Sequence, residues 1–457
     1  MSKRSSFRNR FSFYLLAIGS ACGLGNLWRF PYIVGENGGG AFLLLYVFLA
    51  LTIGMSLLIA ELMVGHYTGV SVLAAAKKVS QQTKRKSIVA FGWLSVIISV
   101  VTLAYYSVIC GWVLHYLTQF LMSLFQKDST VYLSHMSVTM LQQSGWLQFL
   151  LASVHLLISV VIVVKGLGDG VERWITSLLP VFGLLVVVLL IGSLSLESTP
   201  EVLRFLFYPD FSKLNWNSLG HAVGHVFFTL SLGFGTMVTF GSYFKKDEEH
   251  LPTMGLRVTL IDTLISIVAV LLIFPIAFSM SKQPLTDPSL LFEVLPRFLS
   301  SYKGGVIFGL TFFLCLWLAA LNASLGLLET ITANLVEKKP KLKRSVAASI
   351  SGLTILLITV FPAFSGTIFK NFKMYGHGLI EIFDSFLING LLPVAGLGMV
   401  IIALTGLPEK DRKDLFISQT SMTSQVMYSH WKIVLMWVLP GIIILGLALQ
   451  IIGLFFR

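Results

Sequence analysis

Charged residues are scarce in this chain. They make up 12% of its 457 residues, whereas a soluble protein carries about 25%. Hydrophobic residues make up 55% of the chain, and the mean hydropathy is +0.84. Because so few polar side chains cannot cover a soluble surface of this size, the composition predicts a polytopic membrane protein and excludes an ordinary soluble one.

Cysteines and catalytic motifs are also rare or absent. Cys22, Cys110 and Cys315 are the only cysteines, and all three fall in apolar stretches at unrelated depths, so we expect no disulfide and no cysteine metal site. The sequence contains no His-Glu-x-x-His and no Gly-x-Ser-x-Gly motif, which leaves metalloprotease and serine-hydrolase chemistry without a basis. We therefore predict that the chain is not an enzyme.

Apolar stretches long enough to cross a bilayer recur along the chain. They predict eleven transmembrane helices at residues 11–34, 41–67, 89–125, 147–165, 174–196, 217–242, 253–281, 305–336, 343–365, 376–405 and 431–455. The fold class is therefore expected to be all-α.

The net charge of +12 is explained by topology rather than by a nucleic-acid partner. If the N-terminus is cytoplasmic, the inner segments hold 22 Lys and Arg residues and the outer segments hold 9. This positive-inside bias predicts a cytoplasmic N-terminus and, with eleven spans, an outer C-terminus. Membrane lipid is thus the expected environment, and we expect no nucleic-acid partner.

The first apolar stretch is interrupted in its middle by the run from Gly19 to Asn26, which holds three glycines. An unpaired backbone N–H or C=O costs several kcal/mol in hydrocarbon, so such a break persists only against protein or a watery cavity. A helix that stops and restarts at mid-depth presents carbonyls on one side and amides on the other. These groups can hold a cation and an anion without a charged side chain.

A second interruption, from Phe227 to Gly235, occupies the matching place in span six. Matching breaks predict two inverted five-helix halves, residues 11–196 and 217–405. The remaining segments are 1–10, inside; 197–216, an outer loop; 406–430, a cytoplasmic loop; and 431–457, span eleven and a short outer end. Gly19 and Gly23 also form a Gly-x-x-x-Gly pair, which alone usually means helix packing. The two breaks together favour a binding site.

At these residues the chain resembles the neurotransmitter:sodium symporter family, above all its bacterial amino-acid transporters. The motifs that carry the resemblance are Gly23–Pro31, Glu36–Phe42 and Phe227–Gly235. The resemblance implies an all-α polytopic membrane protein with eleven transmembrane helices, a LeuT-type 5+5 inverted repeat with broken helices 1 and 6. It also implies a place in the bacterial inner (plasma) membrane.

The resemblance further implies a substrate site between the breaks. The amino-acid carboxylate would lie against the amides of Leu24 and Gly25 and the hydroxyl of Tyr106, beside a sodium ion. The ammonium group would meet the carbonyls of Ala21 and Phe228 and the oxygens of Thr229 and Ser231. The side-chain pocket would be lined by Ser20, Thr102, Phe228, Phe234, Ala323 and Leu327.

One or two sodium ions are implied in the same way. The first would use oxygens of Ala21, Asn26, Thr229 and Asp262. The second would use Gly19, Cys22, Ala319 and Asn322, with the neighbouring position 323. Because Ala323 replaces an oxygen-bearing residue of the family, the number of ions stays open.

The family's chloride-site positions read Tyr46, His225, Thr229, Asp262 and Ser266 here. Asp262 supplies a carboxylate where the family usually has Asn, so we expect no chloride requirement. His225 is either a packing residue or part of a titrating pair with Asp262.

The resemblance also implies two gates. Arg29 would pair with Asp384 at the outer gate, and Arg4 with Glu337 at the inner gate, with Phe7 and Tyr243 nearby. Glu61 would brace the unwound part of span six.

These features predict a sodium-coupled symporter that imports a neutral, aliphatic amino acid by alternating access. Two alternatives stay open: a proton-coupled transporter that uses His225 and Asp262, and an amino-acid sensor on the same scaffold that does not transport. The intact gate pairs favour a transporter over a sensor.

Overall fold

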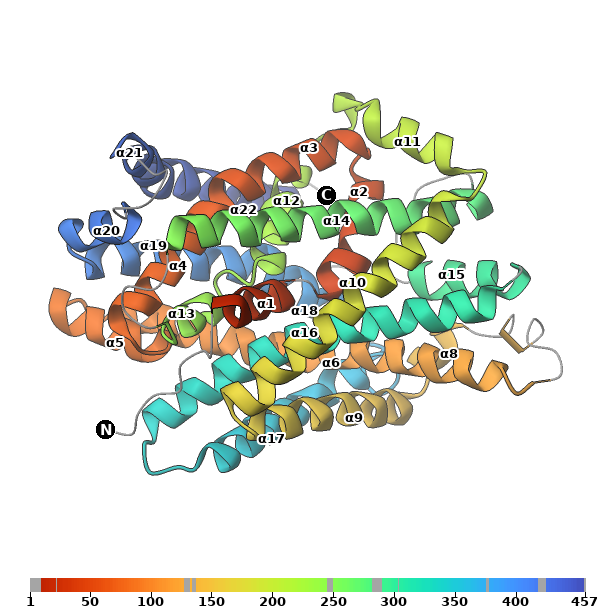
Figure 1. Ribbon diagram of the computed structural model, residues 1–457, viewed down its shortest axis with the longest axis horizontal. Helices are drawn as coiled ribbons and strands as arrows, with labels where there is room; N and C mark the ends of the chain where they lie inside the picture. The colour runs from red at the N-terminus through yellow and green to blue at the C-terminus, as the bar shows by residue number, and fades with distance from the viewer. Residues whose placement is uncertain are drawn as a thin grey trace.

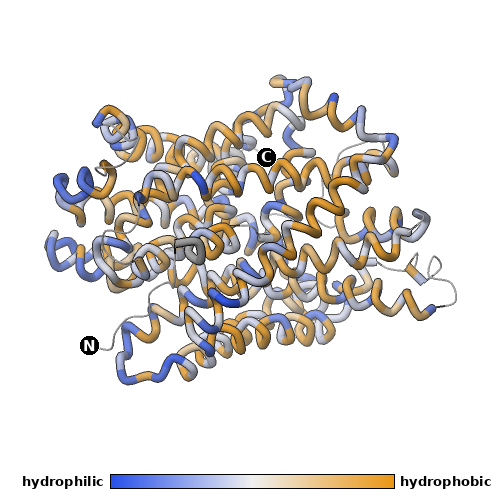
Figure 2. Tube along the Cα trace, viewed as in Figure 1, coloured by the Kyte–Doolittle hydropathy of each residue, from blue (hydrophilic) through white to orange (hydrophobic). Residues whose placement is uncertain are grey.

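The computed structural model describes residues 10–21, 23–126, 132–133, 137–244, 250–281, 290–302, 304–374, 378–417 and 425–455. Its long helices form one bundle (Figure 1). Hydrophobic residues dominate the middle of the bundle, and hydrophilic residues gather toward its ends (Figure 2). This distribution is the one that a bilayer around the middle of the bundle requires.

Within the described residues, eleven membrane-crossing segments follow one another, and the predicted number of spans is confirmed. In chain order they are α1 (Arg10–Ala21) with η1 (Gly25–Arg29) and α2 (Phe30–Glu36); α3 (Gly40–Leu49) with η2 (Ala50–Gly54) and α4 (Met55–Thr68); α6 (Ile88–Ser123); α9 (Gly145–Val164); η3 (Leu167–Glu172) with α10 (Arg173–Leu194); α12 (Trp216–Thr229) with α13 (Thr236–Gly241); α14 (Leu251–Ser281); α16 (Gly305–Lys338); α17 (Arg344–Ala363); α18 (Leu379–Asp384) with η5 (Ser385–Leu391) and α19 (Leu392–Gly406); and α21 (Gln425–Ile433) with η6 (Val434–Val438) and α22 (Leu439–Phe455).

Nine of these segments are helical stretches that are long and apolar enough, within the described residues, to cross a membrane. The other two are the first and sixth spans, each of which is broken into shorter helices. Short helices lie between spans: α5 (Val72–Thr83), α8 (Val138–Gln142), α11 (Thr199–Phe207), η4 (Phe211–Lys213), α15 (Leu290–Ser301) and α20 (Glu409–Phe416).

Small residues set how closely the helices approach. α6 packs against α16, α9 and α17, and this group forms a scaffold on one side of the first span. A Cβ added at Gly111 of α6 would lie 2.9 Å from the backbone nitrogen of Ala152 in α9. A Cβ at Gly65 of α4 would lie 2.0 Å from the carbonyl oxygen of Val238 in α13. Helices in a membrane associate through such close packing because lipid gives them no hydrophobic drive to pair.

The break in span six is a turn between α12 and α13 whose backbone is left-handed at three positions. The φ angles of Ser231, Gly233 and Gly235 are 54°, 79° and 75°. Glycine adopts such angles without steric cost. The amide of Gly233 donates a 2.7 Å hydrogen bond to Oε1 of Glu61, a fully buried residue of α4. Glu61 therefore lies where the sequence places it, against the unwound segment.

The break in span one follows Ala21, the last residue of α1. The amide of Gly23 donates to the carbonyl of Ala21 at 2.9 Å and to Oδ1 of Asn26 at 3.3 Å. The helix resumes at Leu24 and continues through η1 into α2. Because η1 lies against both α12 and α14, the two breaks face each other near the centre of the bundle. The prediction of two broken helices is confirmed.

Candidate functional site

A small cavity lies between the two helix breaks. It is lined by Ser20, Ala21, Gly23, Gly25, Tyr106, Phe228, Thr229, Ser231, Phe234, Ala323 and Leu327. Its volume of about 20 Å³ accommodates little more than a water molecule. An amino acid therefore fits only after side chains shift. The lining contains the residues expected for the substrate except Leu24 and Thr102, and it adds Gly23.

The half-buried ring of Phe228 is the side chain best placed to shift, because it lies directly over the first break. A Cβ added at Gly25 would lie 2.8 Å from that ring. Phe234 meets Phe228 edge-on, with the ring centroids 6.3 Å apart. On the far side, Ser231 Oγ donates to the carbonyl of Ser20 at 3.1 Å and ties the two breaks together.

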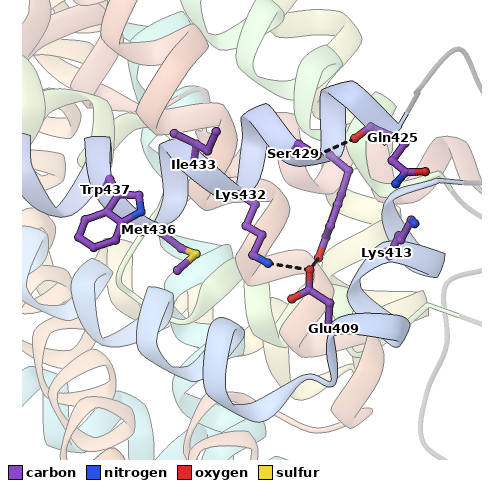
Figure 3. A pocket seen from close by; sticks show the side chains of 9 residues that line it. Glu409, Lys413, Gln425, Ser429, Lys432, Ile433, Met436 and Trp437 are labelled. Carbon is purple, nitrogen blue, oxygen red and sulfur yellow. Dashed lines mark hydrogen bonds and ion pairs between the residues drawn. The ribbon is translucent and has the colours of Figure 1, made fainter.

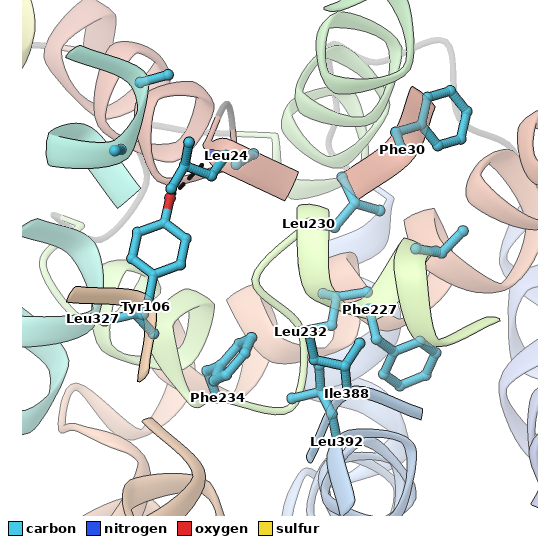
Figure 4. Close-up of a cluster of buried hydrophobic side chains, with 14 of the residues drawn as sticks. Leu24, Phe30, Tyr106, Phe227, Leu230, Leu232, Phe234, Leu327, Ile388 and Leu392 are labelled. Atoms are coloured by element: carbon cyan, nitrogen blue, oxygen red, sulfur yellow. Dashed lines mark hydrogen bonds between the residues drawn. The ribbon is translucent and has the colours of Figure 1, made fainter. Parts of the chain in front are cut away.

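The amide end of the first break faces Tyr106 of α6. The Leu24 amide donates a 3.0 Å hydrogen bond to the Tyr106 hydroxyl, and both residues are labelled in Figure 4. Leu24 does not line the cavity, but its backbone amide forms part of the hydrogen bonding at the first break. Thr102 lies one turn before Tyr106, and its buried hydroxyl has no hydrogen-bond partner in the part of the chain that the structure describes. The Tyr106 hydroxyl and the amides at this helix start together form a site that favours an anion.

A network of buried oxygen-bearing side chains adjoins the cavity. Asn26 Nδ2 donates to Asp262 Oδ1 at 2.7 Å and to Ser266 Oγ at 2.9 Å. The Tyr46 hydroxyl donates to Asp262 Oδ2 at 3.1 Å and lies 3.3 Å from Oγ1 of Thr229. Asn26 and Asp262 are fully buried. Four different spans thus meet around one carboxylate.

This network has the chemistry of a sodium site. A hard cation prefers oxygen ligands, and carboxylate, amide and hydroxyl oxygens are all present. A buried charge is costly in a membrane unless it is paired, so the Asp262 carboxylate favours a cation beside it. Ala21 lines the same cavity, which brings the four residues expected for the first sodium together.

The second expected sodium position contains an unsatisfied amide. Asn322 of α16 is fully buried, and neither Oδ1 nor Nδ2 has a partner among the described residues. A Cβ added at Gly19 would lie 3.7 Å from Cβ of Asn322, so α1 and α16 touch here. Leaving a buried polar atom unpaired costs about 1–3 kcal/mol, which an oxygen ligand of a cation avoids. Ala319 is buried in the same helix, and Cys22 lies outside the described residues.

Comparison with known proteins identifies the family of this chain. The model of the Sodium:neurotransmitter symporter family matches residues 4–129 and 122–455. The chain belongs to this family. It is 31% identical to the sodium-dependent transporter YhdH of Bacillus subtilis over 99% of this chain and 98% of that protein. It is 28% identical to an uncharacterized sodium-dependent transporter of Haemophilus influenzae over 94% of this chain and 96% of that protein.

A solved structure shares the fold. The crystal structure of MhsT in complex with L-phenylalanine superposes with a TM-score of 0.87 at 30% identity, covering 97% of this chain and 99% of MhsT. The chain is therefore an integral membrane protein and a sodium-dependent transporter of the symporter family, not an enzyme. The predicted 5+5 repeat with broken helices 1 and 6 is confirmed.

On the α2 side of the cavity, Arg29 of this symporter forms a branched network. Its Nε donates to Asp384 Oδ2 at 3.2 Å, and its Nη2 donates to Asn389 Oδ1 at 3.3 Å. Tyr105 donates its hydroxyl to the other oxygen of Asp384 at 3.2 Å. The guanidinium carbon lies 5.9 Å from the centre of the Phe228 ring. The expected pair of Arg29 and Asp384 is present, but sequence reasoning missed Asn389 and Tyr105.

His225 belongs to this outer network rather than to a direct pair with Asp262. Its Nδ1 lies 3.4 Å from Nη1 of Arg29, and its ring stacks on Phe30 at 4.9 Å. Tyr46 stands between His225 and Asp262: its ring centre is 5.5 Å from that of His225, while its hydroxyl bonds to Asp262. Of the two interpretations left open for His225, these contacts favour packing, and His225 is connected to Asp262 through Tyr46.

The opposite side of the cavity carries a second network, made of a tyrosine, a carboxylate and an arginine. Tyr243, expected beside Arg4 and Glu337, donates its hydroxyl to Glu329 Oε1 at 2.7 Å. Arg344 forms a salt bridge with the same carboxylate. Sequence reasoning missed Glu329 and Arg344, although a carboxylate within the apolar run of α16 was a usable signal.

Glu337 makes a separate contact at the same end of the bundle. Its carboxylate accepts a hydrogen bond from the amide of Ser71 at 2.9 Å, at the start of α5. Arg4 and Phe7 lie outside the described residues. The proposed pair of Arg4 and Glu337 therefore stays a prediction.

Replacing Arg29 with lysine tests the outer network. A lysine ammonium cannot hold Asp384, Asn389 and His225 at once, as the planar guanidinium does. For R29K we expect sodium-dependent amino-acid binding to persist while uptake falls about tenfold, equivalent to ~1.4 kcal/mol. Initial uptake rates in proteoliposomes measure this, with R204K on the exposed face of α11 as the matched control. Wild-type uptake by R29K would contradict a role for the branched contacts.

Proposed function

We propose that this transporter imports a neutral, aliphatic amino acid together with sodium by alternating access. The observation that carries the proposal is the juxtaposition at the two breaks. The Leu24 amide and the Tyr106 hydroxyl lie at one end of the cavity, and the Asn26–Asp262 network adjoins it. An amino-acid carboxylate bound at the Leu24 amide and the Tyr106 hydroxyl would lie next to a sodium ion held by the Asn26–Asp262 network. Substrate would then bind well only after the ion.

The cavity lining supports a neutral substrate. No acidic or basic side chain is among the described residues that line it. A charged substrate side chain would therefore be buried unpaired at high cost. The carbonyls of Ala21 and Phe228, with the oxygens of Thr229 and Ser231, would take the ammonium group.

The two phenyl rings support an aliphatic side chain. Phe228 and Phe234 enclose the remaining space together with Ala323 and Leu327. We therefore rank Leu, Val, Met and Ala above Phe, Tyr and Trp as substrates. L-Phenylalanine, present in the structure of MhsT, is the first aromatic competitor to compare.

The proposed cycle moves spans 1, 2, 6 and 7 against a scaffold of spans 3, 4, 8 and 9. Residues 11–196 and 217–405 would form the two halves of the repeat. The N-terminus would be cytoplasmic and the C-terminus outside, in a bacterial inner membrane. Each charge that moves inward gains about 2.3 kcal/mol per 100 mV, and a tenfold sodium gradient adds about 1.4 kcal/mol. The number of ions thus decides how steeply substrate is concentrated.

Two observations weigh against the alternatives. Proton coupling through His225 and Asp262 is disfavoured because Tyr46 lies between the two: its ring centre is 5.5 Å from that of His225, and its hydroxyl donates to Asp262. A sensor without transport is disfavoured because Arg29 and Asp384 retain a gate contact that has to open and close.

Uptake into proteoliposomes under separate sodium and proton gradients tests the proposal. A sodium gradient alone should drive uptake of labelled leucine or alanine, and replacing sodium with choline should abolish both uptake and high-affinity binding. Uptake under a proton gradient alone would support the proton-coupled alternative. Binding without uptake would support the sensor. If tryptophan competes best, the aliphatic preference is wrong.

Asp262 should make chloride unnecessary. Its carboxylate already places a negative charge beside Tyr46 and Ser266, so replacing chloride with gluconate should leave wild-type uptake unchanged. For D262N we expect sodium activation to weaken about tenfold, or ~1.4 kcal/mol, and uptake to become dependent on chloride. D210N, at an exposed acidic residue, is the control. Loss of wild-type uptake in gluconate would refute the idea.

The second sodium should bind weakly, because position 323 offers only a methyl group beside Asn322. Adding a hydroxyl in A323S should raise the apparent sodium affinity and move the sodium Hill coefficient of uptake toward two. A333S, elsewhere on the same helix, should change neither quantity. A coefficient of one in both wild type and A323S would instead indicate a single-ion cycle.

A further inference from the structure

A cleft on the surface of span eleven lies apart from the substrate cavity (Figure 3). It is formed by α20 on one side and by α21 with η6 on the other, and its volume is about 420 Å³. Its walls include Glu409, Lys413, Lys432, Ile433, Met436 and Trp437. A cleft of this size lies within the range of small-molecule sites, about 300–1,000 Å³.

One end of the cleft carries excess positive charge. Lys432 Nζ lies 2.7 Å from Glu409 Oε1, and Arg412 Nη2 lies 2.7 Å from Glu409 Oε2. The hydrogen bond from Lys432 and the contact with Arg412 hold the pKa of Glu409 below its ordinary value, so this carboxylate stays ionised at neutral pH. Lys413 has no ion pair in the part of the chain that the structure describes. Two lysines, Lys413 and Lys432, therefore line this end with a single carboxylate, Glu409, which leaves a net charge of +1 among the lining residues.

The other end of the cleft is apolar and exposed. Ile433, Met436 and Trp437 are 52%, 39% and 72% exposed and continue along span eleven toward the middle of the bilayer. Figure 3 shows Trp437 and Met436 at the end opposite Lys413 and Gln425. The wall follows η6, a π-helical stretch, and such stretches in α-helices frequently occur at functional sites.

The order of these groups matches the order of groups in a phospholipid. Lysines stand where a helix enters the membrane, and an apolar wall with an interfacial tryptophan follows within about two turns. Basic pockets at the cytoplasmic ends of transmembrane helices bind anionic head groups. A soluble phosphate ester would pair with the lysines but would make no contact with the apolar wall.

We propose that this cleft binds an anionic glycerophospholipid, with its phosphate between Lys413 and Lys432 and an acyl chain along Ile433, Met436 and Trp437. The inference goes beyond transport and needs only that the chain lies in a membrane. With the proposed orientation, the lipid belongs to the cytoplasmic leaflet. Its phosphate joins α20 to span eleven, whose Trp431 donates to the carbonyl of Ser56 in α4 at 3.0 Å. Lipid binding therefore steadies the contact between spans eleven and two.

Native mass spectrometry of the purified full-length chain tests this site. Detergent-solubilised protein is titrated with dioleoyl phosphatidylglycerol, with dioleoyl phosphatidylcholine and, separately, with sn-glycerol 3-phosphate. We expect one tightly retained phosphatidylglycerol, with phosphatidylcholine bound at least tenfold more weakly. Each of K413Q and K432Q should weaken phosphatidylglycerol about fivefold, and the double variant about 25-fold. K432R keeps the charge and should keep the lipid.

Matched variants separate this site from general surface charge. K410Q removes an exposed lysine of the same helix that does not line the cleft, and it should leave lipid retention unchanged. W437A should weaken phosphatidylglycerol without altering the weak binding of glycerol phosphate. A single monodisperse peak in size-exclusion chromatography and an unchanged thermal unfolding midpoint check that each variant is folded.

Three results would overturn the proposal. If phosphatidylcholine were retained as tightly as phosphatidylglycerol, the lysines would not select an anionic head group. An equal loss in K410Q and K413Q would show non-specific attraction of anions. Glycerol phosphate bound as tightly as the lipid would identify a soluble phosphate ester as the occupant.

Discussion

The bilayer offers no water to an unpaired backbone group, and this constraint governs the centre of the molecule. Two helices break at mid-depth, so the amides and carbonyls that they release must find partners in the protein. Glu61 accepts a hydrogen bond from the Gly233 amide in one break, and the Tyr106 hydroxyl accepts one from the Leu24 amide in the other. Both partners come from helices outside the broken spans. The breaks thus exist only because the surrounding bundle satisfies them, and the proposed function places the two charged ends of an amino acid between them.

A single carboxylate connects the broken spans to the rest of the bundle. Asp262 accepts hydrogen bonds from Asn26 at the first break and from Tyr46 in span two. The Tyr46 hydroxyl also forms a hydrogen bond with Thr229 at the second break. Because the group is fully buried, its charge is tolerated only while donors or a cation surround it. A cation bound here would contact four spans, the same four that move in the proposed cycle, and this would couple the ion to a change of shape.

The sequence was most informative where local chemistry decides the structure. Glycines and polar residues in the middle of apolar runs predicted both breaks, and the lengths of the apolar runs predicted the eleven spans. The partners of long side chains were less predictable. Asn389 and Glu329 contact Arg29 and Tyr243 because of how η5 and α16 are rotated about their axes, and the pattern of apolar residues fixes such rotations only within a broad face. His225 illustrates the same limit, since the sequence left open whether it packs or pairs with Asp262 and did not indicate its contact with Arg29.

The small size of the central cavity connects the site to its gates. On the outer side the Phe228 ring covers Gly25, lines the cavity and lies under the guanidinium of Arg29. A substrate large enough to displace this ring from the cavity therefore acts directly on the cation that joins spans one and ten. On the inner side, Tyr243 follows the second break and bonds to Glu329, which Arg344 also holds. Movement of the second break thus pulls on a buried ion pair. Both networks attach to the broken spans, so in the proposed cycle one side would open while the other stays closed if these short helices tilted against α6 and α16, which pack closely on each other.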